Sequence, residues 1–364
     1  MKLKLECYSV PDPFGHHHAL LQKGDWLFVA ISDGQHAGLG EASFSGDDTR
    51  CIARIRELFK KYIEGMVLSP DSLKEIGLVW ADDQLDFLTA TAVSGLDQAL
   101  YDLLGKREGV PVWQLTMPNP VQDRVPVYVT INRALSDRTV ADYLGVIEAA
   151  RHQGFEAIKC APFESVTVDG DQVAQSQSGR SVLHAIRAAY PDISVRIDFH
   201  QRFAADRFIQ LLPELDSCLP CWYEEPCEMG PAYREIMNHT TVPIAGGERH
   251  HLDEDLMDLM DSGWVNVVMP DIIHVGGWTS LHKICEGAAD YPAIEVSLHN
   301  PSGPVSTLAS LHAAVISSTV TSIEIPFRVD AAVLPYQHLL EGGHFTVPQK
   351  PGWGITLDYI RGLA

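Results

Sequence analysis

The chain has 364 residues, of which 46% are hydrophobic and 21% charged, a balance typical of a folded globular protein large enough for two domains. Its formal net charge of −21 argues against nucleic acid or an anionic membrane as a partner, because the chain would repel polyphosphate. No apolar run reaches the roughly 18 residues of a membrane span, and the N-terminus lacks the apolar core of a signal peptide, so we expect a cytoplasmic protein.

Residues 1–120 are predicted to form an α+β domain. Apolar residues alternate with polar ones at 2–10 and 24–32, which indicates two strands of an antiparallel sheet. Helices are expected at about 47–64 and 92–106, where apolar residues recur at helical spacing.

From residue 121 to 344, short apolar runs alternate with helical patterns, which predicts a (β/α)₈ barrel. The expected strands lie at 125–131, 156–161, 193–198, 221–226, 242–248, 265–271, 293–299 and 321–326. The helical patterns lie at 138–152, 179–189, 203–213, 229–237, 253–261, 277–288 and 303–316. The tail 345–364 is expected to return to the N-terminal domain and pack on it.

Three acidic residues, Asp198, Glu224 and Glu248, each close one of the apolar runs and are spaced by 26 and 24 residues. This spacing corresponds to one strand plus one helix, so their carboxylates should meet at one rim, on adjacent strands roughly 4.8 Å apart. Carboxylate oxygens are the ligands that Mg²⁺ prefers in proteins. A single acid at a strand end is often a solvated loop residue, but three in register favour a metal site.

The sixth and seventh runs end in Asp271 and His299, on neighbouring predicted strands. A carboxylate beside an imidazole fixes its tautomer and raises its basicity, which is the arrangement of a general base. Side-chain alternation along the third run places His200 on the same face as Asp198. The rim is completed by a lysine on the second run and an acid on the eighth, Lys159 and Glu324.

Four segments together resemble the enolase superfamily, in its mandelate racemase-like branch, over essentially the whole chain. They are Ala92–Lys106, Trp222–Pro226, Gly247–Arg249 and Pro270–Gly277. Two further segments, Asp198–His200 and His299–Pro304, are most similar to acid-sugar dehydratases of the D-galactonate type. The resemblance implies an N-terminal capping domain on a C-terminal barrel, a small anionic sugar acid as the substrate, and assembly into a homo-oligomer.

The resemblance also implies a reaction. Mg²⁺ would be held by the three acidic residues and would bind the carboxylate and α-oxygen of an aldonate or aldarate. His299, oriented by Asp271, would remove the proton α to that carboxylate. His200 would protonate the departing 3-hydroxyl, and the resulting enol would tautomerise to a 2-keto-3-deoxy acid. Glu324 would act in or just behind this catalytic group.

One position departs from many relatives, which carry two lysines separated by one residue on the second strand. The second of these positions is Ala161 here, which leaves Lys159 to neutralise either the substrate or the excess of rim carboxylates. Losing this base favours dehydration over epimerisation or racemisation. Epimerase, racemase or cycloisomerase chemistry on the same site is one alternative, and a catalytically silent sugar-acid binder is another. His17 and His18 are candidates for contacts with sugar hydroxyls, because a loop near this position covers the substrate in similar proteins.

Overall fold

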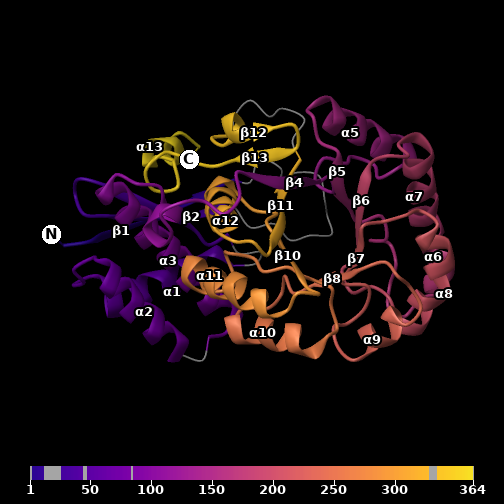
Figure 1. Ribbon diagram of the computed structural model, residues 1–364, viewed down its shortest axis with the longest axis horizontal. Coiled ribbons are helices and arrows are strands. Elements are labelled where there is room, and N and C mark those ends of the chain that lie inside the picture. Colours follow the sequence, from indigo (N-terminus) through magenta and orange to yellow (C-terminus); the bar gives the residue numbers. More distant parts are fainter. Residues whose placement is uncertain (1, 12–25, 44–46, 83–84, 328–333, 364) are drawn as a thin grey trace.

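The protein is described by a computed structural model, which covers residues 2–11, 26–43, 47–82, 85–327 and 334–363. Figure 1 shows two parts side by side, a smaller one built from the first strands and helices and a larger barrel. The C-terminal segment returns to the smaller part, so that both ends of the chain lie there (Figure 1).

The N-terminal domain contains one antiparallel sheet covered by helices. Its strands, in the order β1-β2-β3, are β1 (Lys4–Val10), β2 (Trp26–Ser32) and β3 (Ala37–Glu41). Its helices are α1 (Asp48–Leu58), a π-helical turn η1 (Phe59–Ile63), α2 (Pro70–Asp82), α3 (Phe87–Glu108) and α4 (Val112–Thr116). The two predicted strands and two predicted helices are present, while β3, α2 and α4 were not predicted.

Strand β3 escaped prediction because its sequence, Ala-Gly-Leu-Gly-Glu, has low intrinsic strand propensity. Its glycines serve the packing of α3 instead. A Cβ atom on Gly40 would lie 1.9 Å from the backbone oxygen of Gly95, in the middle of α3. Tertiary packing therefore decides the conformation of this segment, and only glycine allows so close an approach.

The C-terminal domain is a closed barrel of eight parallel strands, which confirms the predicted fold class. The strands are β4 (Arg124–Thr130), β5 (Ala157–Cys160), β6 (Ser194–Asp198), β7 (Trp222–Glu224), β8 (Ile244–Gly246), β9 (Val267–Val268), β10 (Glu295–Leu298) and β11 (Val320–Pro326). Each strand pairs with the next one in the sequence, and pairing of β11 with β4 closes the barrel.

Helices cover the outside of the barrel. They are α5 (Val140–His152), α6 (Gln172–Gln175), α7 (Gln177–Ala189), α8 (Ala205–Asp216), α9 (Ala232–Met237), α10 (Asp253–Ser262), α11 (Gly277–Gly287), the 3₁₀ turn η2 (Ala288–Asp290) and α12 (Pro304–Val315). Seven of these correspond to the predicted helical patterns, within about three residues at each end. Among the described helices, none is long and apolar enough to cross a membrane.

The chain after β11 contacts both domains. A 3₁₀ turn η4 (Gln337–Leu339) leads into a hairpin of β12 (Leu340–Glu341) and β13 (His344–Thr346), and β13 pairs antiparallel with β4. Further on, the backbone N–H of Trp353 donates to Asp102 of α3, and its indole N–H donates to the carbonyl of Leu39. Helix α13 (Leu357–Leu363) follows and lies near β1 in Figure 1.

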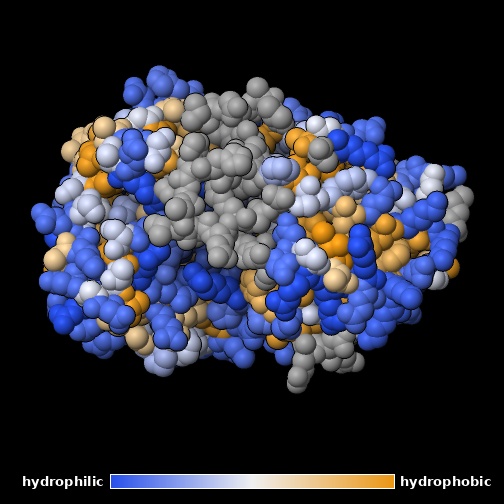
Figure 2. All heavy atoms as spheres, turned by 180° about the vertical axis from the view of Figure 1, so that it is seen from behind, coloured by the Kyte–Doolittle hydropathy of each residue, from blue (hydrophilic) through white to orange (hydrophobic). Residues whose placement is uncertain are grey.

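The described surface is mostly hydrophilic when the molecule is seen from behind, and its hydrophobic residues are scattered in small groups (Figure 2). The apolar residues gather inside, in one cluster that fills the N-terminal domain and a larger one that surrounds the barrel. The inside of the barrel holds a third, smaller cluster with Tyr128 and Trp222. This third cluster forms the floor beneath the polar rim described next.

Candidate active site

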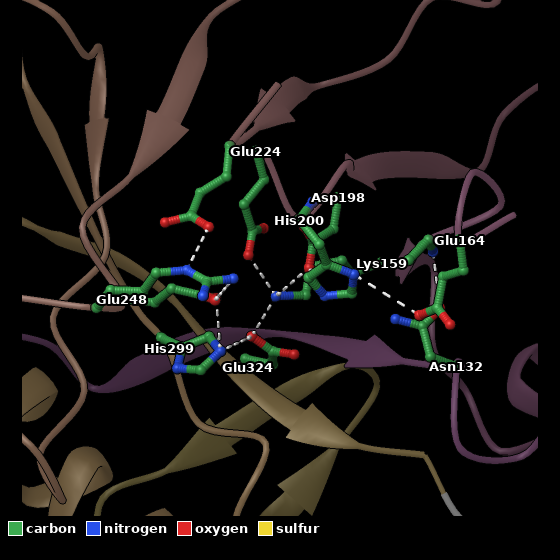
Figure 3. A network of polar contacts seen from close by, with 12 residues as sticks. Asn132, Lys159, Glu164, Asp198, His200, Glu224, Glu248, His299 and Glu324 are labelled. Carbon is green, nitrogen blue, oxygen red and sulfur yellow. Dashed lines mark hydrogen bonds and ion pairs between the residues drawn. The ribbon is translucent and has the colours of Figure 1, made fainter. Parts of the chain in front are cut away.

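Three carboxylates meet at the carboxyl-end rim of consecutive strands (Figure 3). Asp198 and Glu224 are the last residues of β6 and β7 and stand in register with each other. Strand β8 ends at Gly246, so Glu248 follows on a turn in which Gly247 has a φ of +117°, a conformation that favours glycine. Asp198 and Glu224 are buried, and the Glu248 side chain is 12% exposed.

Lys159 joins these carboxylates from β5. Its Nζ lies 2.6 Å from Oε1 of Glu224, 2.8 Å from Oε2 of Glu324 and 3.9 Å from Oδ2 of Asp198. Burial alone would lower the pKa of Lys159, but Glu224 and Glu324 hold it well above its usual value. Of the two roles considered for Lys159, this geometry favours neutralising the carboxylates of the protein itself.

His299 lies between two carboxylates just after the end of β10. Its Nδ1 is 2.8 Å from Oδ2 of Asp271, and its Nε2 is 2.9 Å from Oε2 of Glu248. Burial alone would lower the pKa of His299, but Glu248 and Asp271 raise it well above its usual value. The Asp271 carboxylate is fully buried and also accepts the backbone N–H of Ile273, so it can hold the imidazole in one orientation.

His200 approaches the same group of carboxylates from the other side of the barrel. Its Nε2 lies 2.8 Å from Oδ2 of Asp198, and its backbone N–H donates to Oδ1 of the same residue. His200 and Gln201 both have positive φ, so a tight turn, and not a continued strand, folds the ring back over Asp198. Burial works against protonation, but the charge of Asp198 raises the pKa of His200 to about 9.

The floor of the site is a stack of aromatic and cationic side chains. The guanidinium of Arg196 lies 4.4 Å from the ring centre of Tyr128 and 4.5 Å from that of Trp222. The Tyr128 hydroxyl donates to Glu324, and the Trp222 indole N–H donates to Glu224. The floor therefore fixes two of the rim carboxylates from below.

The donor set suits a divalent cation. Ligand atoms of Glu224, Glu248 and His299 all lie within 4.8 Å of one another, and Asp198 stands beside Glu224 in the register of the strands. Several carboxylates so close together repel one another when ionised, and a hard cation such as Mg²⁺ relieves that repulsion. The cluster of Glu224, Glu248 and His299 could therefore hold a metal ion, and Asp198 offers a further oxygen donor beside it.

Two polar groups near the rim were not predicted from the sequence. Glu164, in the segment after β5, lies with its Oε1 3.6 Å from Nδ1 of His200. Glu225 is buried and accepts a hydrogen bond from Nε of Arg249, and burial together with Glu248 raises the pKa of Glu225 to about 7. The signal for Glu164 was its place in a loop at the carboxyl end of a barrel strand. The candidates His17 and His18 lie outside the described residues.

Comparison with known proteins agrees with this architecture. Residues 9–116 match the N-terminal domain of mandelate racemase and muconate lactonizing enzyme, and residues 145–360 match the enolase C-terminal domain-like family. A D-galactonate dehydratase from Ralstonia pickettii is 32% identical over 352 residues, which cover 92% of this chain and 89% of the relative.

Solved structures show the same fold at lower identity. A mandelate racemase/muconate lactonizing enzyme from Sulfitobacter sp. has a TM-score of 0.83 at 23% identity, covering 97% of this chain and 92% of the other. A related protein from Roseovarius sp. TM1035 has a TM-score of 0.84 at 24% identity, covering 98% and 93%. The chain therefore belongs to the enolase superfamily, with the N- and C-terminal domains of the mandelate racemase/muconate lactonizing enzyme family.

Proposed function

We propose that this protein is a Mg²⁺-dependent dehydratase that converts a sugar acid, an aldonate or an aldarate, into a 2-keto-3-deoxy acid. The observation that carries the proposal is the placement of two histidines around one acidic cluster. His200 follows β6 and His299 follows β10, the third and seventh strands of an eight-stranded closed barrel, so they stand on opposite sides. The name of the relative from Ralstonia pickettii, a D-galactonate dehydratase, makes D-galactonate the first substrate to test.

In this proposal His299 is the base. Mg²⁺ held by Glu248 would offset the charge that most raises the pKa of His299, so that Nε2 could be unprotonated and take the proton α to the substrate carboxylate. Asp271 holds Nδ1–H and stabilises the imidazolium that forms. Asp198, Glu224 and Glu248 would hold Mg²⁺, which supplies positive charge to offset the negative charge that develops on the substrate carboxylate. Lys159 adds a fixed positive charge below the same site.

His200 is the acid. Carboxylates on both sides of the ring favour the protonated form of His200, and a protonated His200 can transfer Nε2–H to the 3-hydroxyl as the C–O bond breaks and water leaves. The enol that remains tautomerises to the 2-keto-3-deoxy acid. An acid and a base on opposite sides of the barrel suit removal of a proton from one face and of a hydroxyl from the other.

Ala161 supports dehydration over epimerisation. Its side chain offers no proton acceptor at the strand position that carries a second lysine in many relatives. Proton return from the opposite face would then depend on His200 alone. An epimerase would exchange the α-proton and invert that carbon without releasing water.

The experiment combines product detection with isotope exchange. The purified protein is incubated with Mg²⁺ and a panel of aldonates and aldarates, D-galactonate first, and 2-keto-3-deoxy products are detected with semicarbazide. The same reactions are followed by NMR in D₂O. We expect His299→Asn to abolish both α-proton exchange and dehydration, and His200→Asn to keep exchange while losing dehydration.

A histidine far from the site provides the matched control. His282, on α11, stacks on Trp278 and lies 3.6 Å from Glu286, both on its own helix, so His282→Asn should keep both activities. If the wild-type protein exchanges the α-proton without releasing water, the reaction is epimerisation and not dehydration. Tight binding of a sugar acid with neither reaction would identify a silent binder.

A further inference from the structure

Glu164 is a buried carboxylate that the proposed chemistry does not yet use. It lies in the segment between β5 and α6, and its side chain is 5% exposed. Within the part of the chain that the structure describes, neither of its carboxylate oxygens has a hydrogen-bond partner. Burying a carboxylate in this way costs free energy, so its neighbours must explain its place.

Arg138 and His200 flank Glu164. Its Oε2 lies 3.2 Å from Nη1 of Arg138, and its Oε1 lies 3.6 Å from Nδ1 of His200. Figure 3 shows the carboxylate of Glu164 directed toward the His200 ring. At 3.6 Å the contact with His200 is electrostatic and longer than a hydrogen bond, and such contacts often tighten when a substrate binds.

Arg138 anchors the loop on the far side of Glu164. Its guanidinium donates to the backbone carbonyls of Ala161 and Asn132, which fixes the start of the segment that carries Glu164. The side chain of Asn132 also accepts the N–H of Ala161 at 2.7 Å. The loop is thus tied down by its backbone, which leaves the carboxylate of Glu164 to face the histidine.

The two histidines of the site are each flanked by two carboxylates in the same order, although the contact of Nδ1 is 2.8 Å for His299 and 3.6 Å for His200. His299 has Nε2 against Glu248 and Nδ1 against Asp271, and His200 has Nε2 against Asp198 and Nδ1 against Glu164. In each case Nε2 faces a carboxylate proposed to hold the metal. In each case Nδ1 faces a buried carboxylate outside that set.

We propose that Glu164 is a positioning residue for His200, as Asp271 is for His299. Its carboxylate faces Nδ1 of His200 and so orients the ring, with Nε2 directed into the site, where its N–H is the one delivered to the leaving hydroxyl. After that transfer His200 is neutral and retains Nδ1–H toward Glu164. This inference rests on the proposed role of His200 and extends it to the residue that orients the ring.

The first experiment separates exchange from dehydration. Wild type, Glu164→Gln and Glu164→Asp are compared in D₂O with the sugar acid that the screen identifies. We expect Glu164→Gln to lower kcat for dehydration at least tenfold, with KM and the rate of α-proton exchange within about threefold of wild type. Glu164→Asp, which retains the charge, should recover part of the dehydration rate.

The chain offers a closely matched control. On the outer helices, Glu214 contacts Arg180 through one carboxylate oxygen and His184 through the other, at 3.1 Å, far from the rim. Glu214→Gln should leave both rates unchanged. Loss of exchange and dehydration together in Glu164→Gln, or no loss of either, would overturn the proposal.

A second experiment needs no substrate. The ring ¹⁵N signals of His200 are identified in NMR spectra as those that disappear in His200→Asn. Their chemical shifts are then measured at the same pH in wild type and in each variant. We expect a protonated Nδ1 in wild type, a clear change of the ring shifts in Glu164→Gln, and no change in Glu214→Gln. Identical His200 shifts in wild type and Glu164→Gln would overturn the pairing, even if no sugar acid is dehydrated and the proposed function itself fails.

Discussion

Glu41 of the N-terminal domain accepts a hydrogen bond of 2.7 Å from the backbone N–H of Gly303 in the barrel. Its other carboxylate oxygen accepts the N–H of Ser306, so the fully buried side chain caps the N-terminus of α12. A Cβ on Gly303 would lie 2.8 Å from Oε1 of Glu41, which explains the glycine. Since the loop from His299 to Gly303 leads into this helix, the N-terminal domain helps to fix the proposed base.

The first prediction concerns this contact between the domains. Glu41→Gln would direct an amide N–H at one of the two backbone N–H groups, which leaves one of them without an acceptor. We expect the free energy of unfolding to fall by about 1–3 kcal/mol, as measured by urea denaturation, and kcat to fall because the loop of His299 loosens. Glu57→Gln is the control, since Glu57 is exposed and pairs with Arg54 on the surface of α1. Unchanged stability in Glu41→Gln would contradict the capping role.

The fold was predictable because strand and helix repeats leave a strong pattern in the sequence. The ends of the apolar runs placed Asp198, Glu224 and Glu248 at one rim, where the structure also has them, and the parity of side chains favoured Glu224, which is in register with Asp198. The parity argument also placed His200 beside Asp198, but in the structure a turn, and not strand alternation, brings the two side chains together. Strand β6 ends at Asp198, and two residues with positive φ turn the histidine back.

Contacts between distant segments left no such signal. The hydrogen bonds of Glu41 join residues 262 and 265 positions apart, and β3 carries too many glycines to be recognised as a strand. The partners of Lys159 depend on side-chain directions inside the barrel, which spacing along the sequence does not determine. Glu164 was missed because its loop has no periodic pattern from which a side-chain direction could be predicted.

The second prediction concerns the metal. If Mg²⁺ binds the acidic rim of the folded protein only, it should raise the free energy of unfolding by about 2.7 kcal/mol at a concentration one hundred times its Kd. Glu248→Gln should need at least ten times more Mg²⁺ to reach the same stabilisation, as measured by urea denaturation at several Mg²⁺ concentrations. Glu254→Gln, at an exposed position on α10, should respond to Mg²⁺ like wild type. An equal response in Glu248→Gln would place the metal elsewhere.

The third prediction tests whether Lys159 neutralises the rim. Lys159→Met keeps most of the side-chain volume but leaves Glu224 and Glu324 without their cation. We therefore expect the free energy of unfolding, measured without Mg²⁺, to fall by about 3–5 kcal/mol. Adding Glu324→Gln should recover part of this loss, because one uncompensated carboxylate is removed. Lys283→Met breaks a half-exposed pair with Asp253 and should cost no more than about 1 kcal/mol. Strictly additive losses in the double variant would count against the ion pair.

The last prediction concerns pH and a histidine away from the catalytic site. His312, on α12, is fully buried, its Nδ1 accepts the backbone N–H of Trp113, and its ring packs against Trp353. Burial lowers the pKa of His312 to about 3, whereas a histidine in the unfolded chain titrates near 6.5. Between these values the unfolded chain binds a proton that the folded protein does not, so stability is full above pH 6.5 and is lost as pH falls toward 3.

From pH 7 to pH 5 this single group should reduce the free energy of unfolding by about 2 kcal/mol. His312→Asn removes the titrating ring and keeps an oxygen that can accept the N–H of Trp113. The variant should therefore be less stable at pH 7, because ring packing is lost, but its stability should fall less steeply toward pH 5. Urea denaturation at four pH values measures the slope, with His152→Asn on the exposed face of α5 as the control. Equal slopes in wild type and His312→Asn would mean that another group governs the acid sensitivity.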